Sequence, residues 1–159
     1  MGLNDWLLAL HILSGFALFA AVTLFWVAIV AIRRTDLPEQ VASVGRLLPV
    51  GNVVVIIGSL GVIVFGVWLA IALDGVQVWD GWVIAAIVLW AIASETGRRA
   101  GPEFAPCVAR AHELVASGQT GPDAQLAALA RTGRGLLLHT IATVAVVLLL
   151  VDMIWKPGA

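Results

Sequence analysis

The chain has 159 residues, of which 61% are hydrophobic and only 12% charged, and its mean hydropathy is +1.02. A soluble domain is roughly 45–50% apolar and about 25% charged, so this composition excludes an ordinary soluble enzyme. Nine basic residues against ten acidic ones leave a net charge of −1, and that balance leaves no electrostatic case for binding nucleic acid. Cys107 is the single cysteine and has no partner for an intramolecular disulfide. The composition indicates an integral membrane protein.

Four apolar segments predict four membrane-spanning helices, at about residues 6–32, 49–73, 79–97 and 136–155. A span needs roughly 20 apolar residues at about 1.5 Å of rise each. The third segment is short, because only about 14 uncharged residues separate Asp80 from Glu95, which makes about 21 Å of helix against a hydrocarbon core of roughly 30 Å. We therefore expect the third helix to continue past Glu95.

The distribution of basic residues predicts how the chain is oriented. Every arginine lies in one of two loops, residues 33–48 and 98–135, and Lys156 alone lies on the opposite side. The positive-inside rule then places both loops in the cytoplasm and both termini outside. Several tryptophans map to the outer interface, as expected for indole side chains: Trp6, Trp68, Trp79, Trp82 and Trp155. The expected fold is an all-α membrane protein, an antiparallel four-transmembrane-helix bundle in a single domain of residues 1–159.

The two cytoplasmic loops are predicted to carry helices. Residues 33–48 read as a short amphipathic helix that begins near Pro38 and lies along the membrane surface. Residues 98–135 predict a helical hairpin between spans three and four. Its first helix starts at Pro102 or Pro106, and its second starts after Pro122.

Two polar residues predict a site in the outer half of the bundle. Polar groups inside a bilayer are costly, so each is a candidate by default. His11 lies shortly after the outer end of the first span, and Met153 lies at a matching depth on the face of the fourth span that His139 shares. Imidazole and thioether together can ligate haem iron or copper. The alternative is a histidine that hydrogen-bonds within the bundle and a methionine that faces lipid or core.

A second group of polar residues is expected near the cytoplasmic ends of spans two, three and four. It consists of Asn52, Ser94, Glu95, His139 and Thr140. A carboxylate and an imidazole within reach of each other could share a proton or bind a metal. In the alternative, Glu95 extends toward Arg98 at the interface and His139 bonds to a neighbouring helix.

Small residues predict close helix packing. Gly51, Gly58 and Gly61 share one side of the second span, and the first span carries Gly15 and several alanines. Small residues allow membrane helices to approach closely. We expect this face to pack within the chain, with a homo-oligomer contact as the alternative.

Both ends of the chain resemble known membrane proteins. The segment 6–15, WLLALHILSG, resembles the first span of bacterial membrane proteins related to copper-resistance protein D. The segment 152–158, DMIWKPG, resembles the Met-x-x-Lys-Pro-Gly terminus of a four-helix family of predicted integral membrane proteins with no assigned function. The resemblance implies copper handling. Through the similar four-helix protoporphyrinogen oxidases, it also implies haem or porphyrin binding with His11 as a ligand.

The sequence predicts one fold but leaves several functions open. The leading hypothesis is a non-catalytic, multi-pass protein of the bacterial cytoplasmic membrane that binds haem b or copper at His11 and Met153. One alternative is an accessory subunit that docks a membrane-protein partner. Another is a small membrane oxidoreductase that acts on porphyrin or quinone. The expected partner is the lipid bilayer, with a membrane-protein partner or a second copy of the chain as further candidates, and no nucleic acid.

Overall fold

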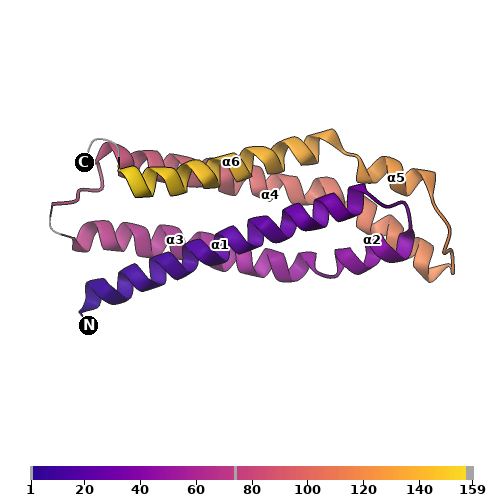
Figure 1. Cartoon of the computed structure of the whole chain (residues 1–159), viewed down its shortest axis with the longest axis horizontal. Coiled ribbons are helices and arrows are strands. Elements are labelled where there is room, and N and C mark those ends of the chain that lie inside the picture. Colours follow the sequence, from indigo (N-terminus) through magenta and orange to yellow (C-terminus); the bar gives the residue numbers. More distant parts are fainter. Residues whose placement is uncertain (1, 74, 157–159) are drawn as a thin grey trace.

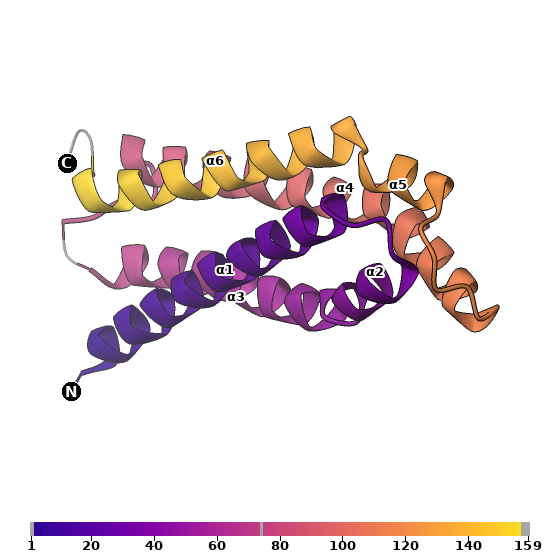
Figure 2. The same ribbon diagram turned by 45° about the vertical axis from the view of Figure 1, so that its right-hand side comes forward.

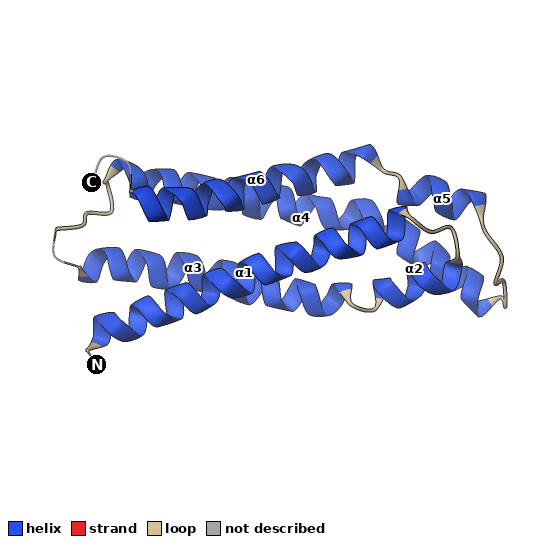
Figure 3. Cartoon of the chain, in the orientation of Figure 1, coloured by secondary structure: helices blue, strands red, loops and turns tan. Residues whose placement is uncertain are grey.

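A computed structural model describes residues 2–73 and 75–156 of the chain, so Pro157 and Gly158 of the terminal motif lie outside the described residues. The described residues form six α-helices and contain no strand. Figures 1 and 3 show them running along one long axis, with both termini at the same end. The helices are α1 (Leu3–Arg33), α2 (Pro38–Gly45), α3 (Leu48–Ala72), α4 (Gly81–Ala116), α5 (Ala124–Ala130) and α6 (Gly133–Trp155).

Three stretches are long and apolar enough to cross a membrane. They are Leu3–Arg33, Pro38–Ala72 and Ala124–Trp155, and they contain the first, second and fourth predicted spans. The third predicted span, residues 79–97, lies in α4, which is not among these candidates. Its apolar first half is followed at once by Glu95, Arg98 and Arg99, and the helix continues past Glu95 as expected.

The long helices pair into two antiparallel hairpins. α1 packs along α3, and α4 packs along α6, whereas α3 and α4, and likewise α1 and α6, touch only over short stretches. In Figures 1 and 2, α1 crosses over α3 near the middle of both helices. Gly58 lies at this crossing, where a Cβ atom on it would stand 2.5 Å from the backbone nitrogen of Leu18. This confirms that the glycine face of the second span packs within the chain.

The end of the molecule away from the termini has its own apolar core. α2, α5 and the second half of α4 meet there with the end of α1. Its buried residues are Ile32, Val41, Ala42, Cys107, Ala111, Leu114, Leu126 and Ala130. α2 buries its apolar stripe against α4 and in Figure 1 follows the same long axis as α3.

The predicted helical hairpin is present, but its first helix does not begin at a proline. α4 runs without a break through Pro102 and Pro106. A proline inside a helix removes a hydrogen bond and costs about 3 kcal/mol, so packing has to offset the loss. Phe104 and Cys107, which lie between and just after the prolines, are both buried. The second helix, α5, starts as predicted, with Asp123 accepting a hydrogen bond of 2.7 Å from the backbone N–H of Leu126.

Candidate functional site

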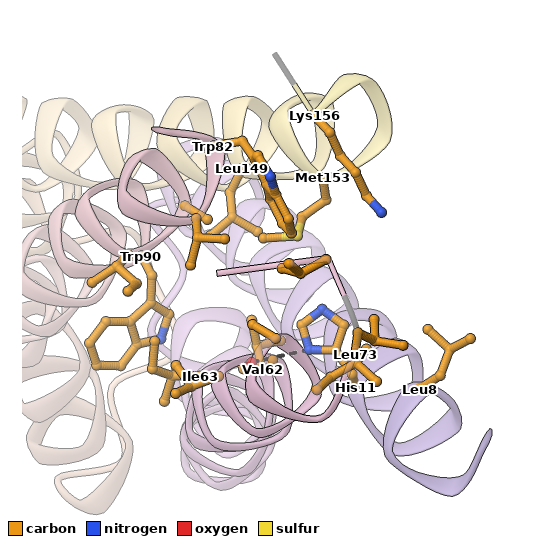
Figure 4. A pocket seen from close by; sticks show the side chains of 18 of the residues that line it. Leu8, His11, Val62, Ile63, Leu73, Trp82, Trp90, Leu149, Met153 and Lys156 are labelled. Carbon is orange, nitrogen blue, oxygen red and sulfur yellow. Dashed lines mark hydrogen bonds between the residues drawn. The ribbon is translucent and has the colours of Figure 1, made fainter. Parts of the chain in front are cut away.

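One pocket lies between the two hairpins, at the end of the molecule where α1 begins and α6 ends. It has a cavity volume of about 280 Å³ and is lined by α1, α3, α4 and α6, by Leu73 and Val76 between α3 and α4, and by Lys156 after α6. Figure 4 shows His11 rising from α1, with Met153 and Lys156 on the opposite side and Trp82 and Trp90 on the α4 wall. The rest of the lining is aliphatic, so these five residues carry its chemistry.

The imidazole of His11 is held in one tautomer by a neighbouring helix. Its Nδ1 lies 3.1 Å from the backbone oxygen of Val62 on α3. A carbonyl oxygen can only accept, so Nδ1 carries the hydrogen and Nε2 keeps a free lone pair. Gly66 makes room for the ring, since a Cβ atom there would stand 2.8 Å from Cε1 of His11. His11 therefore offers the pocket a hydrogen-bond acceptor or a metal ligand.

Met153 lines the same pocket from α6. The structure therefore brings together the two residues that helical periodicity and depth had paired, although they lie at opposite ends of the chain. Its thioether is a soft donor that suits Cu(I). The residues that the structure describes contain no group of three His, Cys, Asp or Glu side chains able to hold a metal ion. A metal in the pocket would depend on His11 and Met153.

Three further residues of the pocket were not predicted as site residues. Trp90 donates through Nε1 to the backbone oxygen of Ser59 at 3.0 Å, which ties α4 to α3. Trp82 is 8% exposed, and the ammonium nitrogen of Lys156 lies 5.3 Å from the centre of its ring. The sequence indicated Trp82 only as a tryptophan at the membrane interface. It indicated Lys156 only as part of the C-terminal motif. Neither signal indicates a pocket.

The predicted inner polar residues do not form one bonded group. Glu95 is paired along its own helix, with its carboxylate 2.8 Å from the guanidinium of Arg98 and also bridged to Arg99. Thr140 donates to the backbone oxygen of Leu136, and Asn52 is exposed. Glu95 and His139 are joined by neither a hydrogen bond nor an ion pair in the described part of the chain.

His139 lies instead among aromatic rings of α1. It is 5% exposed, and its ring meets those of Trp26 and Phe25 edge-on at centroid distances of 5.0 and 6.2 Å. Trp26 donates through Nε1 to the hydroxyl of Thr143 at 2.7 Å, one turn further along α6. His139 does not line the pocket. It therefore serves the contact between α1 and α6, and the two membrane histidines do not share a site.

The lining of the pocket thus includes two strong polar groups, one of which belongs to an exposed residue. One is the acceptor Nε2 of His11, and the other is the ammonium of Lys156 at the end of α6. Met153 adds a soft sulfur atom between α6 and the cavity. The chain matches no protein-family model, no curated protein and no solved structure.

Proposed function

We propose that this chain is a four-span protein of the bacterial cytoplasmic membrane, with both termini outside and the ends of α2, α4 and α5 in the cytoplasm. The uneven distribution of arginine supports the orientation. Exposed large apolar side chains support the first half of α4 as the third span, because they continue onto it from the other long helices: Ile84, Ile87, Val88 and Ile92. The terminal motifs support membership of the four-helix integral-membrane family that they resemble.

We further propose that the pocket binds a small lipid-soluble ligand that carries a ring hydroxyl, of the hydroquinone class. The observation that carries this proposal is the free Nε2 of His11 inside an apolar cavity, with Nδ1 committed to Val62. A ligand hydroxyl can donate a hydrogen bond to Nε2, and the aliphatic lining can pack against the ligand's ring.

The volume of the cavity bears on which ligands fit. Small-molecule pockets span roughly 300–1,000 Å³, so about 280 Å³ suits a single substituted ring. Haem is a macrocycle far larger than such a ring, and His139, the second membrane histidine, is not in the pocket to complete a bis-histidine ligand set. The pocket is therefore too small for haem b.

Binding of an alkyl hydroquinone to the purified protein in lipid nanodiscs tests the proposal. Titration should quench the fluorescence of the tryptophans that line the pocket and give a saturable isotherm. His11→Ala should weaken binding about tenfold or more, because an unpaired buried hydroxyl costs on the order of 1–3 kcal/mol. His112→Ala, at an exposed position of α4, is the matched control and should bind as the wild type does. Equal affinity in His11→Ala would contradict the proposal.

Cu(I) is a second candidate ligand, and it is favoured by one observation, the presence of Met153 in the same pocket as the free Nε2 of His11. Two soft or borderline donors can hold Cu(I). Competition with a chromophoric Cu(I) chelator should then show one bound ion, which His11→Ala and Met153→Leu should each remove. If Met153→Leu leaves copper binding unchanged, the metal is not held at this site.

A further inference from the structure

Lys156 is placed at the pocket by an unusual end to α6. It follows Trp155 directly and closes the helix in the left-handed backbone region, with φ of 41° and its N–H bonded to the backbone oxygen of Asp152 at 2.8 Å. It is the only described non-glycine residue with positive φ. Glycine is the usual residue at such a cap. Lysine at this cap therefore has a backbone conformation that non-glycine residues rarely adopt.

Lys156 is an exposed residue that lines the pocket. Its ammonium stands 5.3 Å from the ring centre of Trp82, an arrangement in which the aromatic face attracts the cation. Figure 4 shows this lysine beside Met153, with His11 across the cavity. Every arginine of the chain lies toward the other end of the fold, in or beside α2, α5 and the polar half of α4. Lys156 is thus the only basic side chain at this end, and it lies at the pocket.

We propose that Lys156 is a second anchor for the ligand and selects a ring with oxygen atoms at two positions. His11 accepts a hydrogen bond from one hydroxyl, and the ammonium of Lys156 donates to the second oxygen. A hydroquinone has both oxygens, whereas a monophenol has one. This inference rests on the proposed function, because it names the chemistry that the same pocket prefers. Lys156 is a specificity-determining residue in this account.

The experiment compares two probes of equal chain length, octylhydroquinone and 4-octylphenol, on the full-length protein in nanodiscs. We expect the wild type to bind the hydroquinone about tenfold more tightly, since a hydrogen bond to a charged group is worth about 1.5–3 kcal/mol. Lys156→Gln should reduce hydroquinone affinity to that of the phenol and leave the phenol unchanged. Lys156→Arg should restore the preference. Arg134→Gln, at the far end of the molecule, should have no effect on either probe.

The outcomes separate this inference from the proposal on which it rests. If the phenol binds in a His11-dependent way and the hydroquinone binds no more tightly, the pocket function stands and the role of Lys156 is wrong. If the preference survives in Lys156→Gln, the role of Lys156 is again wrong. If neither probe binds, both proposals fail.

Discussion

At the scale of single residues, the pocket depends on a glycine and a carbonyl oxygen as much as on its histidine. Gly66 leaves the space that the His11 ring occupies, and Val62 supplies the oxygen that fixes the tautomer. Both belong to α3, one turn apart, so one helix face positions the imidazole. A hydrogen bond from one ring nitrogen to a backbone oxygen sets which ring nitrogen remains free. Of the other glycines of α3, Gly58 meets the backbone of α1, whereas Gly51 and Gly61 meet side chains of α1.

Gly58→Ala should destabilise the protein by about 1–3 kcal/mol, because the added methyl group meets the backbone of Leu18 and forces α1 and α3 apart. Denaturant unfolding in detergent, followed by tryptophan fluorescence, measures the effect. Gly15→Ala is the matched control on α1, since a Cβ atom there meets nothing within 4 Å, and higher helix propensity should make it neutral or stabilising by up to about 1 kcal/mol. Equal effects of the two substitutions would contradict the close crossing.

At the scale of elements, the two predicted groups of polar residues differ in what the fold does with them. His11 and Met153, which were paired by depth, line one pocket, whereas Asn52, Glu95 and His139, which were also grouped by depth, do not form one bonded group. Depth does not determine which way a side chain points around its helix. Lys156 could not be predicted as a pocket residue, because its position depends on the left-handed turn after α6. The unbroken course of α4 through its prolines depends on tertiary packing that no local pattern contains.

The rate at which the Cys107 thiol is labelled measures whether α2, α4 and α5 stay packed. Burial raises the pKa of its thiol, so at pH 7–8 it carries less reactive thiolate than a free cysteine, whose pKa is about 8.5. Maleimide labelling should therefore be slow in the native protein. Leu126→Ala should accelerate labelling, because it leaves a cavity in the core that contains Cys107 and costs about 2–5 kcal/mol. Leu137→Ala, at an exposed position, should leave the rate unchanged. Fast labelling of the wild type would contradict this packing.

At the scale of the whole molecule, two hairpins are joined firmly at one end and only loosely at the other. The joined end contains the apolar core around α2 and α5, and the looser end contains the pocket. The sequence predicted the long helices and their antiparallel order, because hydrophobic segments of spanning length are a strong signal. It did not predict the unequal contact between the hairpins, because that depends on which helix faces meet.

The proposed orientation predicts which surfaces a membrane-impermeant thiol reagent reaches in intact cells. With Cys107 replaced by alanine, Trp79→Cys should label from the outside, since this exposed residue lies at the end with the termini. Gln119→Cys, between α4 and α5, should label only after the cells are permeabilised. The reverse pattern would place the arginine-rich end outside and contradict the topology.

The central claim is that Nε2 of His11 is a free acceptor that a ligand hydroxyl occupies. Nitrogen-15 NMR of the histidine rings, in protein held in nanodiscs, measures it most directly. Without ligand, one ring should show a protonated Nδ1 and a pyridine-type Nε2, and that signal pair should vanish in His11→Ala. Added alkyl hydroquinone should shift the Nε2 resonance in the direction of hydrogen bonding and leave Nδ1 in place. A His11 Nε2 that carries the proton, or one that does not respond to saturating hydroquinone, would contradict the account.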